Sequence, residues 1–216
     1  MSILNDIIEE FCLKYSSPTS KELNEVYRDT WVNVMYPQMM TNELQGHLLS
    51  MISVLKTPNL ILEIGTFTGY ATICLAKGLD ANGKIITIEK NKELENRINK
   101  NLSDARILNK TELFIGDAQE IIERHFSKMI ESFDIIYIDA DKENYQRYLE
   151  LTYPLLNRKG IILADNIFWG GKVFEENTKL TKEINGIKNF LEAANKLKWQ
   201  NKTIIPIGDG LFFGLK

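Results

Sequence analysis

From residue 59 onward, strand-length runs of apolar residues alternate with longer segments whose apolar residues recur at helical spacing. The apolar runs predict strands near residues 59–64, 84–89, 112–116, 134–139 and 160–165. The segments between them predict helices near residues 68–79, 91–109, 117–130 and 142–157. Strands that alternate with helices in this way are typical of a parallel sheet covered on both faces. The pattern therefore predicts an α/β fold with a doubly wound, mostly parallel sheet.

The N-terminal part of the chain departs from this alternation. Residues 1–56 predict a helical segment, in which Thr19 or Ser20 caps one helix. Asn42 and Gln45 are spaced as a capping box for a second helix, because an amide at each position can satisfy backbone groups of the first turn. We therefore expect helices before the sheet, and a single domain over residues 1–216 whose cofactor-binding core spans residues 57–216.

The C-terminal part departs from it as well. A helix is predicted near residues 181–198, followed by strands at 202–206 and 211–214. The turn between these strands reads Gly208-Asp209-Gly210, and glycine-rich turns of this kind join antiparallel strands. The mostly parallel sheet is therefore expected to end in a C-terminal antiparallel hairpin.

Composition and charge narrow the function classes. The 216 residues are 44% hydrophobic and 25% charged, with a net charge of −3 and no long Lys/Arg run, which argues against a nucleic-acid substrate. No apolar stretch has membrane-spanning length, and residues 1–10 lack the positive start of a secretory signal. Cys12 and Cys74 have no metal-binding spacing. We expect a cytoplasmic protein with no membrane partner.

The first candidate site is the turn after the first core strand. Apolar residues 60–62 lead to Glu63 and Gly65, and Gly69 precedes an apolar segment of helical length. Such a turn brings bare backbone near a ligand, and the helix start offers free N–H groups. The next strand ends on Glu89, 24 residues after Gly65 (89 − 65), where an acid suits ribose hydroxyls. The alternative is a βα turn that binds no ligand.

The same turn lacks the features of a phosphate-binding site. The second and third glycines of a dinucleotide motif are missing, as is the Lys-Ser/Thr ending of a phosphate loop. Glu63 would repel a phosphate and attract a cation. A positively charged nucleoside fits these properties, and S-adenosylmethionine is such a ligand.

The second candidate site combines the ends of two later strands. One buried strand ends on Asp139 and another on Asp165-Asn166. The ends of adjacent parallel strands meet at one edge of a sheet, and two carboxylates with an amide oxygen suit Mg²⁺. The alternative is that these polar residues only cap the helices that follow.

Together these stretches resemble the cation-dependent, S-adenosylmethionine-dependent O-methyltransferases of the caffeoyl-CoA and catechol type. The resemblance covers almost the whole length, through residues 39–41, 62–70, 89, 116–118, 139–145, 165–171 and 206–210. It implies a single class I methyltransferase domain with a Rossmann-like fold. It also implies a homodimer, and it adds S-adenosylhomocysteine as the product of the cofactor.

The resemblance also implies roles for individual residues. The metal ligands are Asp139, Asp165 and Asn166, for Mg²⁺ with Ca²⁺ or Mn²⁺ as alternatives. The catalytic residues are Lys142, the proposed general base, and Asp139, and Trp169 lies on the substrate side. The residues expected to bind the cofactor are Met39, Thr41, Glu63, Gly65, Thr66, Phe67, Gly69, Tyr70, Ala71, Glu89, Lys90, Asp117, Ala118, Asp139 and Asp141.

Two positions depart from the plant members of the family. Ala71 stands where they usually carry Ser, and Gln45 stands where they carry Glu, which leaves a plant-like choice of substrate in doubt. We expect methyl transfer to a hydroxyl of a small catechol-like or phenolic acceptor. The alternatives are methylation of a hydroxylated wobble uridine in tRNA, on the same scaffold, and a cofactor-binding protein without catalysis. Whether Lys142 acts as a base or as an electrostatic stabiliser stays open at this point.

Overall fold

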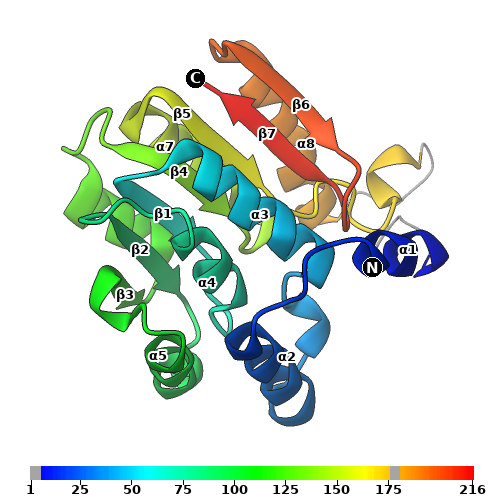
Figure 1. Cartoon of the computed structure of the whole chain (residues 1–216). Helices are drawn as coiled ribbons and strands as arrows, with labels where there is room; N and C mark the ends of the chain where they lie inside the picture. The colour runs from blue at the N-terminus through cyan, green and yellow to red at the C-terminus, as the bar shows by residue number, and fades with distance from the viewer. Residues whose placement is uncertain (1–5, 176–180) are drawn as a thin grey trace.

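The computed structural model describes residues 6–175 and 181–216, so residues 1–5 of the expected N-terminal helical segment lie outside it. Its centre is one seven-stranded sheet with the strand order β3-β2-β1-β4-β5-β7-β6 (Figure 1). The strands are β1 (Leu60–Ile64), β2 (Lys84–Glu89), β3 (Thr111–Ile115), β4 (Phe133–Ile138), β5 (Leu156–Ala164), β6 (Asn201–Ile205) and β7 (Leu211–Leu215). The first five pair in parallel, whereas β7 pairs antiparallel with β5 and β6. The expected fold class, including the C-terminal hairpin, is confirmed.

Helices cover both faces of this sheet (Figure 1). In the described chain they are α1 (Asp6–Lys14), α2 (Lys21–Asn33), α3 (Glu43–Lys56), α4 (Tyr70–Ala76), α5 (Glu95–Asp104), α6 (Ala118–Ile121), α7 (Tyr145–Thr152) and α8 (Lys182–Lys196). One face carries α3 and α4, and the other carries α7 and α8, which lie behind the sheet in the view of Figure 1.

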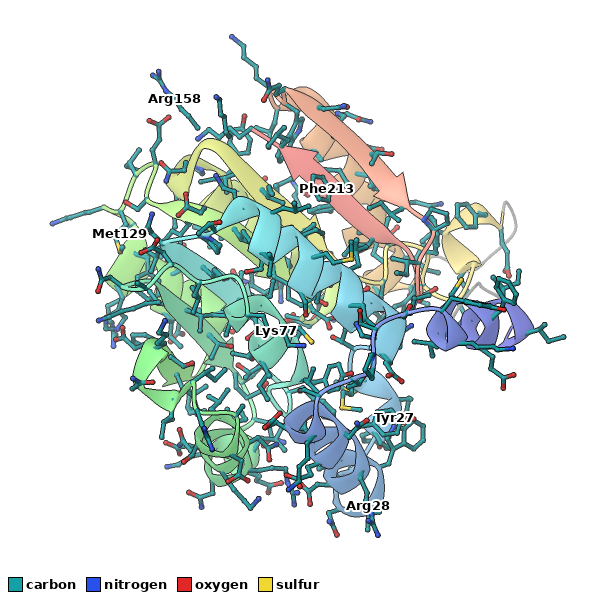
Figure 2. The ribbon with its side chains drawn as sticks, in the orientation of Figure 1. Tyr27, Arg28, Lys77, Met129, Arg158 and Phe213 are labelled. Carbon is teal, nitrogen blue, oxygen red and sulfur yellow. The ribbon has the colours of Figure 1, made fainter. Side chains whose placement is uncertain are left out.

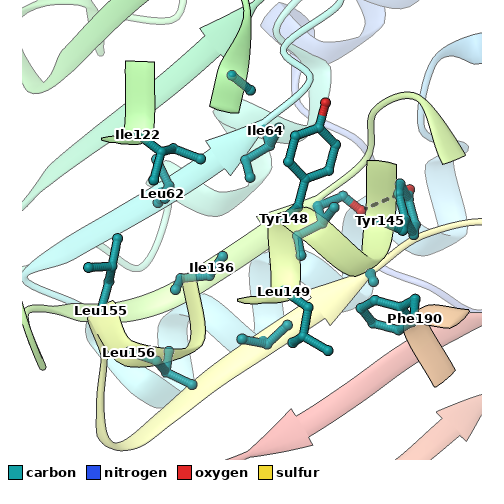
Figure 3. Packing of buried hydrophobic residues seen from close by; sticks show 14 of the residues in the cluster. Leu62, Ile64, Ile122, Ile136, Tyr145, Tyr148, Leu149, Leu155, Leu156 and Phe190 are labelled. Atoms are coloured by element: carbon teal, nitrogen blue, oxygen red, sulfur yellow. Dashed lines mark hydrogen bonds between the residues drawn. The ribbon is translucent and has the colours of Figure 1, made fainter. Parts of the chain in front are cut away.

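Alternating strand residues build a core on each face of the sheet. In β1, Ile61 packs in the core beneath α3 and α4, whereas Leu62 and Ile64 pack in the core beneath α6, α7 and α8. The second core includes Tyr145 and Phe190, whose ring centroids lie 5.8 Å apart (Figure 3). Because the central strands are buried on both faces, they read as continuous apolar runs.

One of the two hydrogen bonds of the predicted capping box of α3 is present. The Asn42 side chain accepts a hydrogen bond from the Gln45 backbone N–H at 2.8 Å. Ser20 stands at the N-cap of α2, although its side chain makes no capping hydrogen bond there. The chain reverses after Lys56, where Thr57 has a left-handed backbone and Pro58 follows.

The helices after β1 are shorter than their apolar pattern predicts. The segment expected as one helix over 91–109 consists of α5 with a 3₁₀ turn on either side. The segment expected over 117–130 leaves α-helical geometry after Ile121 and forms a π turn. Pro154 interrupts the helix expected over 142–157, so α7 ends at Thr152 and β5 begins at Leu156. β5 begins before the strand expected near 160–165. Its residues 157–159 are polar and partly or fully exposed, so they lack the apolar pattern of a buried strand.

In the part of the chain that the structure describes, no helix is both long enough and apolar enough to cross a membrane.

Candidate active site

The candidate residues gather where the central parallel strands end. A cleft at this edge of the sheet is lined by the loop before α3, the turn after β1, and the end of β4. Its lining residues are Met39, Met40, Thr41, Gly65, Thr66, Phe67, Thr68, Tyr70, Ala71 and Asp139. Eight of the fifteen residues expected to bind the cofactor therefore share one cleft. A larger cavity lies between α7 and α8, far from these residues.

Gly65 was expected to bring bare backbone near a ligand, and its conformation gives a second reason for a glycine at this position. Its φ of +95° is a backbone conformation that other residues rarely adopt. A Cβ atom at this position would lie 1.9 Å from the carbonyl oxygen of Asp139. The glycine thus lets the ends of β1 and β4 approach each other, which brings Asp139 to the rim of the cleft.

Glu63 is fully buried at the end of β1. Its Oε2 atom accepts hydrogen bonds at 2.5 Å from the hydroxyls of Thr72 and Thr87. Its Oε1 atom is the buried side-chain atom without a hydrogen-bond partner among the described residues. Burial raises the pKa of Glu63 to about 8, although the two threonine hydroxyls oppose this shift. Gly65 and Thr66, which follow Glu63 closely in the chain, line the cleft. A buried oxygen without a partner next to this turn fits a cationic or hydrogen-donating ligand.

The raised pKa of Glu63 predicts how stability depends on pH. The folded protein without ligand retains the Glu63 proton between its ordinary pKa of 4.5 and about 8, where the unfolded chain has lost it. Folding stability should therefore fall as pH rises through this window, by at most about 1.4 kcal/mol per pH unit for one proton. In urea denaturation at pH 5 and pH 8, Glu63→Gln should lose less stability than the wild type. The exposed control Glu112→Gln should keep the wild-type slope, and an unchanged slope in Glu63→Gln would contradict the prediction.

Glu89 lies at the end of β2 with 8% of its surface exposed. Its Oε2 atom accepts the Phe67 backbone N–H and its Oε1 atom the Asn91 backbone N–H, both at 2.7 Å. Burial raises its pKa, whereas these backbone donors act against the shift. Both oxygens retain further acceptor capacity, so the carboxylate is fixed beside the turn and can still accept hydroxyl groups.

Lys142 is buried beside Asp139. Its Nζ atom lies 3.1 Å from Oδ1 of Asp139 and 2.5 Å from the Tyr145 hydroxyl. The Tyr145 hydroxyl also lies within hydrogen-bond distance of the carbonyl oxygens of Ile138 and Asp165. The side chain of Lys142 is 5% exposed, so its position is fixed from both sides. An amine held next to a strand-end carboxylate can move a proton or stabilise a developing negative charge.

Asp165 ends β5 and is almost completely buried. Its Oδ2 atom accepts the Gln45 side-chain amide at 2.6 Å and the Tyr137 hydroxyl at 3.0 Å. Its Oδ1 atom accepts the backbone N–H of Asn166 at 2.6 Å. Burial and the neighbouring Asp139 raise its pKa, and Lys142 opposes the shift. The two carboxylates of the expected metal set are thus close enough to repel each other.

Other expected site residues lie at the same edge of the sheet but outside the lining of the cleft. Asp117 caps α6 by accepting the backbone N–H of Gln119, and Ala118 begins that helix. Asp141 accepts the Tyr148 hydroxyl at 2.6 Å. The remaining ones are Gly69, which caps α4, Lys90, which is exposed after β2, and Asn166 and Trp169 in the loop after β5.

The structure adds residues that the sequence pattern did not assign to the site. Tyr145 packs in the core beneath α7 and α8, and its hydroxyl also contacts Lys142. Asp209 was interpreted only as part of a turn, yet both of its carboxylate oxygens accept the Gly170 backbone N–H, at 2.8 and 2.9 Å. Only the unusual pairing of an acid with two flanking glycines hinted at such a role.

Among the described residues, no three His, Cys, Asp or Glu side chains are grouped to hold a metal ion. The expected metal ligands are the carboxylates of Asp139 and Asp165 and the amide oxygen of Asn166, so this set does not require a third acid. Oxygen donors of this kind are nevertheless those that Mg²⁺ binds together with water or substrate oxygens.

The sheet order and the cleft at the strand ends are those of a Rossmann-like methyltransferase architecture. The sequence model of a family described as O-methyltransferase matches residues 13–216. A catechol O-methyltransferase of Niastella koreensis is 33% identical over 154 residues, which are 71% of this chain and 69% of the relative. Caffeoyl-CoA O-methyltransferase 2 of Petunia hybrida is 30% identical, over 88% of this chain and 80% of the relative.

A solved structure gives the same result. An O-methyltransferase from Bacillus cereus in complex with S-adenosylhomocysteine superposes with a TM-score of 0.88 at 27% identity, over 97% of each chain. This chain belongs to the O-methyltransferase family. The expected enzyme class, an S-adenosylmethionine-dependent O-methyltransferase, is confirmed, whereas nothing in these relatives supports the tRNA alternative.

Proposed function

We propose that this enzyme moves the methyl group of S-adenosylmethionine to a hydroxyl of a small catechol-like or phenolic acceptor, with the help of a divalent cation, Mg²⁺. The observation that carries the proposal is the buried contact of Lys142 with Asp139 beside Asp165, next to the cleft. The relatives named for catechol and caffeoyl-CoA support the acceptor class.

The cleft fits the charge and shape of the cofactor. The partnerless Oε1 atom of Glu63 lies below it, and an ammonium or sulfonium group would offset the charge that this carboxylate acquires. Glu89 would receive the ribose hydroxyls, and Asp117 with Ala118 would flank the base. The Bacillus cereus relative, whose title names a bound S-adenosylhomocysteine, supports this assignment.

The rim of the cleft fits a divalent cation. Asp139, Asp165 and Asn166 would hold it through oxygen atoms, and the repulsion between the two carboxylates would be relieved by its charge. When bound, the cation would lower the pKa of an acceptor hydroxyl and fix the direction of its oxygen. A free phenol has a pKa near ~10, so little of it is ionised at neutral pH without such help.

The chain's own groups then orient the acceptor and move its proton. The Nζ atom of Lys142 is held by Asp139 and Tyr145, which places a proton-carrying group at the acceptor side of the rim. Trp169 would lie against the acceptor ring. Methyl transfer forms the new oxygen–carbon bond as the sulfur–methyl bond of the cofactor breaks, and it leaves S-adenosylhomocysteine. The hydroxyl proton goes to water or to Lys142 in its neutral amine form.

Transfer of a labelled methyl group to a panel of catechols and to bulk tRNA, with and without Mg²⁺, tests this function. We expect labelled catechols only when Mg²⁺ is present. Label in tRNA with none in any phenol would overturn the acceptor class, and equal labelling without cation would overturn the metal assignment.

We also propose that the enzyme is a homodimer. Apolar side chains are exposed along the N-terminal helices, where Tyr27 points outward from α2 (Figure 2). Phe11 is 63% exposed, Val32 is 72% exposed, and Leu55 on α3 is 83% exposed. An apolar surface of this kind is typical of subunit interfaces.

Light scattering at micromolar concentration should give about twice the chain mass of 24.9 kDa. Val32→Glu and Leu55→Glu should shift the enzyme toward the monomer, because they place charge in the interface. Ile130→Glu, at an apolar position before β4 that is 57% exposed, is the control and should leave the mass unchanged. A wild-type monomer would refute the proposal.

A further inference from the structure

Three hydrogen-bond donors surround the carboxylate of Asp165, a ligand of the proposed cation site on which this inference rests. A carboxylate has about four lone-pair positions. Two are filled on Oδ2, by the side-chain amide of Gln45 and the hydroxyl of Tyr137. A third is filled on Oδ1, by the backbone N–H of Asn166. The remaining acceptor position therefore belongs to Oδ1.

Gln45 is held firmly in its place. It lies in the first turn of α3, where its own backbone N–H is fixed by the Asn42 cap, and its side chain is buried with 2% exposure. Gly208 leaves room for it, since a Cβ atom at that position would lie 2.5 Å from the Gln45 Oε1 atom. The amide thus reaches Asp165 from α3, and the turn between β6 and β7, which is distant in the sequence, leaves space for it.

We propose that Gln45 is a positioning residue of the cation site. Its N–H group holds Oδ2 of Asp165 toward the interior, so that Oδ1 is the oxygen presented to a cation. The Tyr137 hydroxyl assists from β4. Groups that orient metal ligands in this way commonly determine metal affinity without touching the ion.

The amide also determines the charge of the site. With Gln at position 45, two carboxylates and the Lys142 ammonium leave one net negative charge around the rim. A glutamate at position 45 would lose the donor and add a third carboxylate against Oδ2 of Asp165. Such a protein should depend on a divalent cation for stability, because only a cation would offset the added repulsion.

The test measures Mn²⁺ binding by the full-length enzyme, using calorimetry and the electron paramagnetic resonance signal of free Mn²⁺. Gln45→Met keeps the length of the side chain and removes its hydrogen bonding. We expect it to weaken Mn²⁺ binding about 10–100-fold, with an unchanged dissociation constant for S-adenosylhomocysteine. Gln146→Met, at a half-buried site on α7 whose side-chain amide donates to Glu150, should bind Mn²⁺ as the wild type does.

Gln45→Glu gives an independent measurement. Its melting temperature in chelator should be lower than that of Gln45→Met, and Mn²⁺ should raise it by more than it raises that of the wild type. Gln146→Glu should show neither change. Wild-type Mn²⁺ affinity in Gln45→Met, or an equal response of Gln45→Glu and wild type to Mn²⁺, would overturn the inference alone. Failure of the wild type to bind Mn²⁺ would overturn the proposed cation site itself.

Discussion

Replacing Lys142 with alanine is expected to lower kcat about 10²–10⁴-fold, the usual contribution of positioned proton transfer. The dissociation constant for S-adenosylmethionine should stay near that of the wild type. Lys142 contacts Asp139 and Tyr145 at the rim, and none of the hydrogen bonds of the described residues joins it to Glu63 or Glu89. Steady-state kinetics on a catechol, together with calorimetry, separate the two effects.

The pH profile of Lys142→Ala separates a base from an electrostatic stabiliser. If Lys142 removes the proton, the residual rate should climb with pH as free phenolate becomes available. If its positive charge only steers the anion, no such rescue should occur. Lys182→Ala, an exposed lysine on α8, is the matched control and should keep the wild-type rate. A near wild-type kcat in Lys142→Ala on every accepted substrate would remove the lysine from the mechanism.

Removing divalent cations with excess chelator should abolish turnover, and added Mg²⁺ should restore it. The rim carries Asp139 and Asp165 against the single Lys142 ammonium, so a phenolate arriving there adds a second net negative charge. Two like charges 4 Å apart cost about 4 kcal/mol at an effective dielectric constant of 20, which corresponds to roughly a thousandfold in rate. Without a cation, the chain has no further positive group in contact with these carboxylates among the described ion pairs.

Binding of S-adenosylhomocysteine is the control for this experiment. Glu63 and Glu89 hold their positions through threonine hydroxyls and backbone N–H groups. Cofactor binding should therefore persist in chelator. Full activity in excess chelator would show that Asp139 and Asp165 serve only the architecture of the strand ends.

The sheet and its order of elements could be predicted because the central strands are buried on both faces. Runs such as residues 60–62 and 135–138 have no polar interruption, and their short length then separates them from the helices. The lengths of the helices were predicted less well. Turns of 3₁₀ and π geometry keep nearly the spacing of an α-helix, so apolar residues continue past the points where α5 and α6 end.

The site could be predicted to the extent that its residues stand at strand ends. Asp139 and Asp165 were placed together because adjacent parallel strands end at one edge. The partners of these residues could not be predicted in the same way. Gln45 reaches Asp165 across 120 positions of sequence, and the Tyr145 hydroxyl reaches the carbonyl oxygen of Asp165 across 20 positions. Such contacts depend on packing between distant segments, which a local pattern does not record.

The hydrogen bonds from the Gly170 backbone N–H to Asp209 connect the C-terminal hairpin to the loop that carries Trp169. The turn between β6 and β7 and the loop after β5 share one buried carboxylate, and the ring of Phe168 lies where a side chain at Gly210 would stand. Substitutions near position 169 and near position 209 therefore have to respect the same contacts, although 40 positions separate the two segments. A variant that enlarges the proposed acceptor side at Trp169 therefore has to keep the contact between Asp209 and Gly170, so the C-terminal hairpin constrains the proposed substrate site.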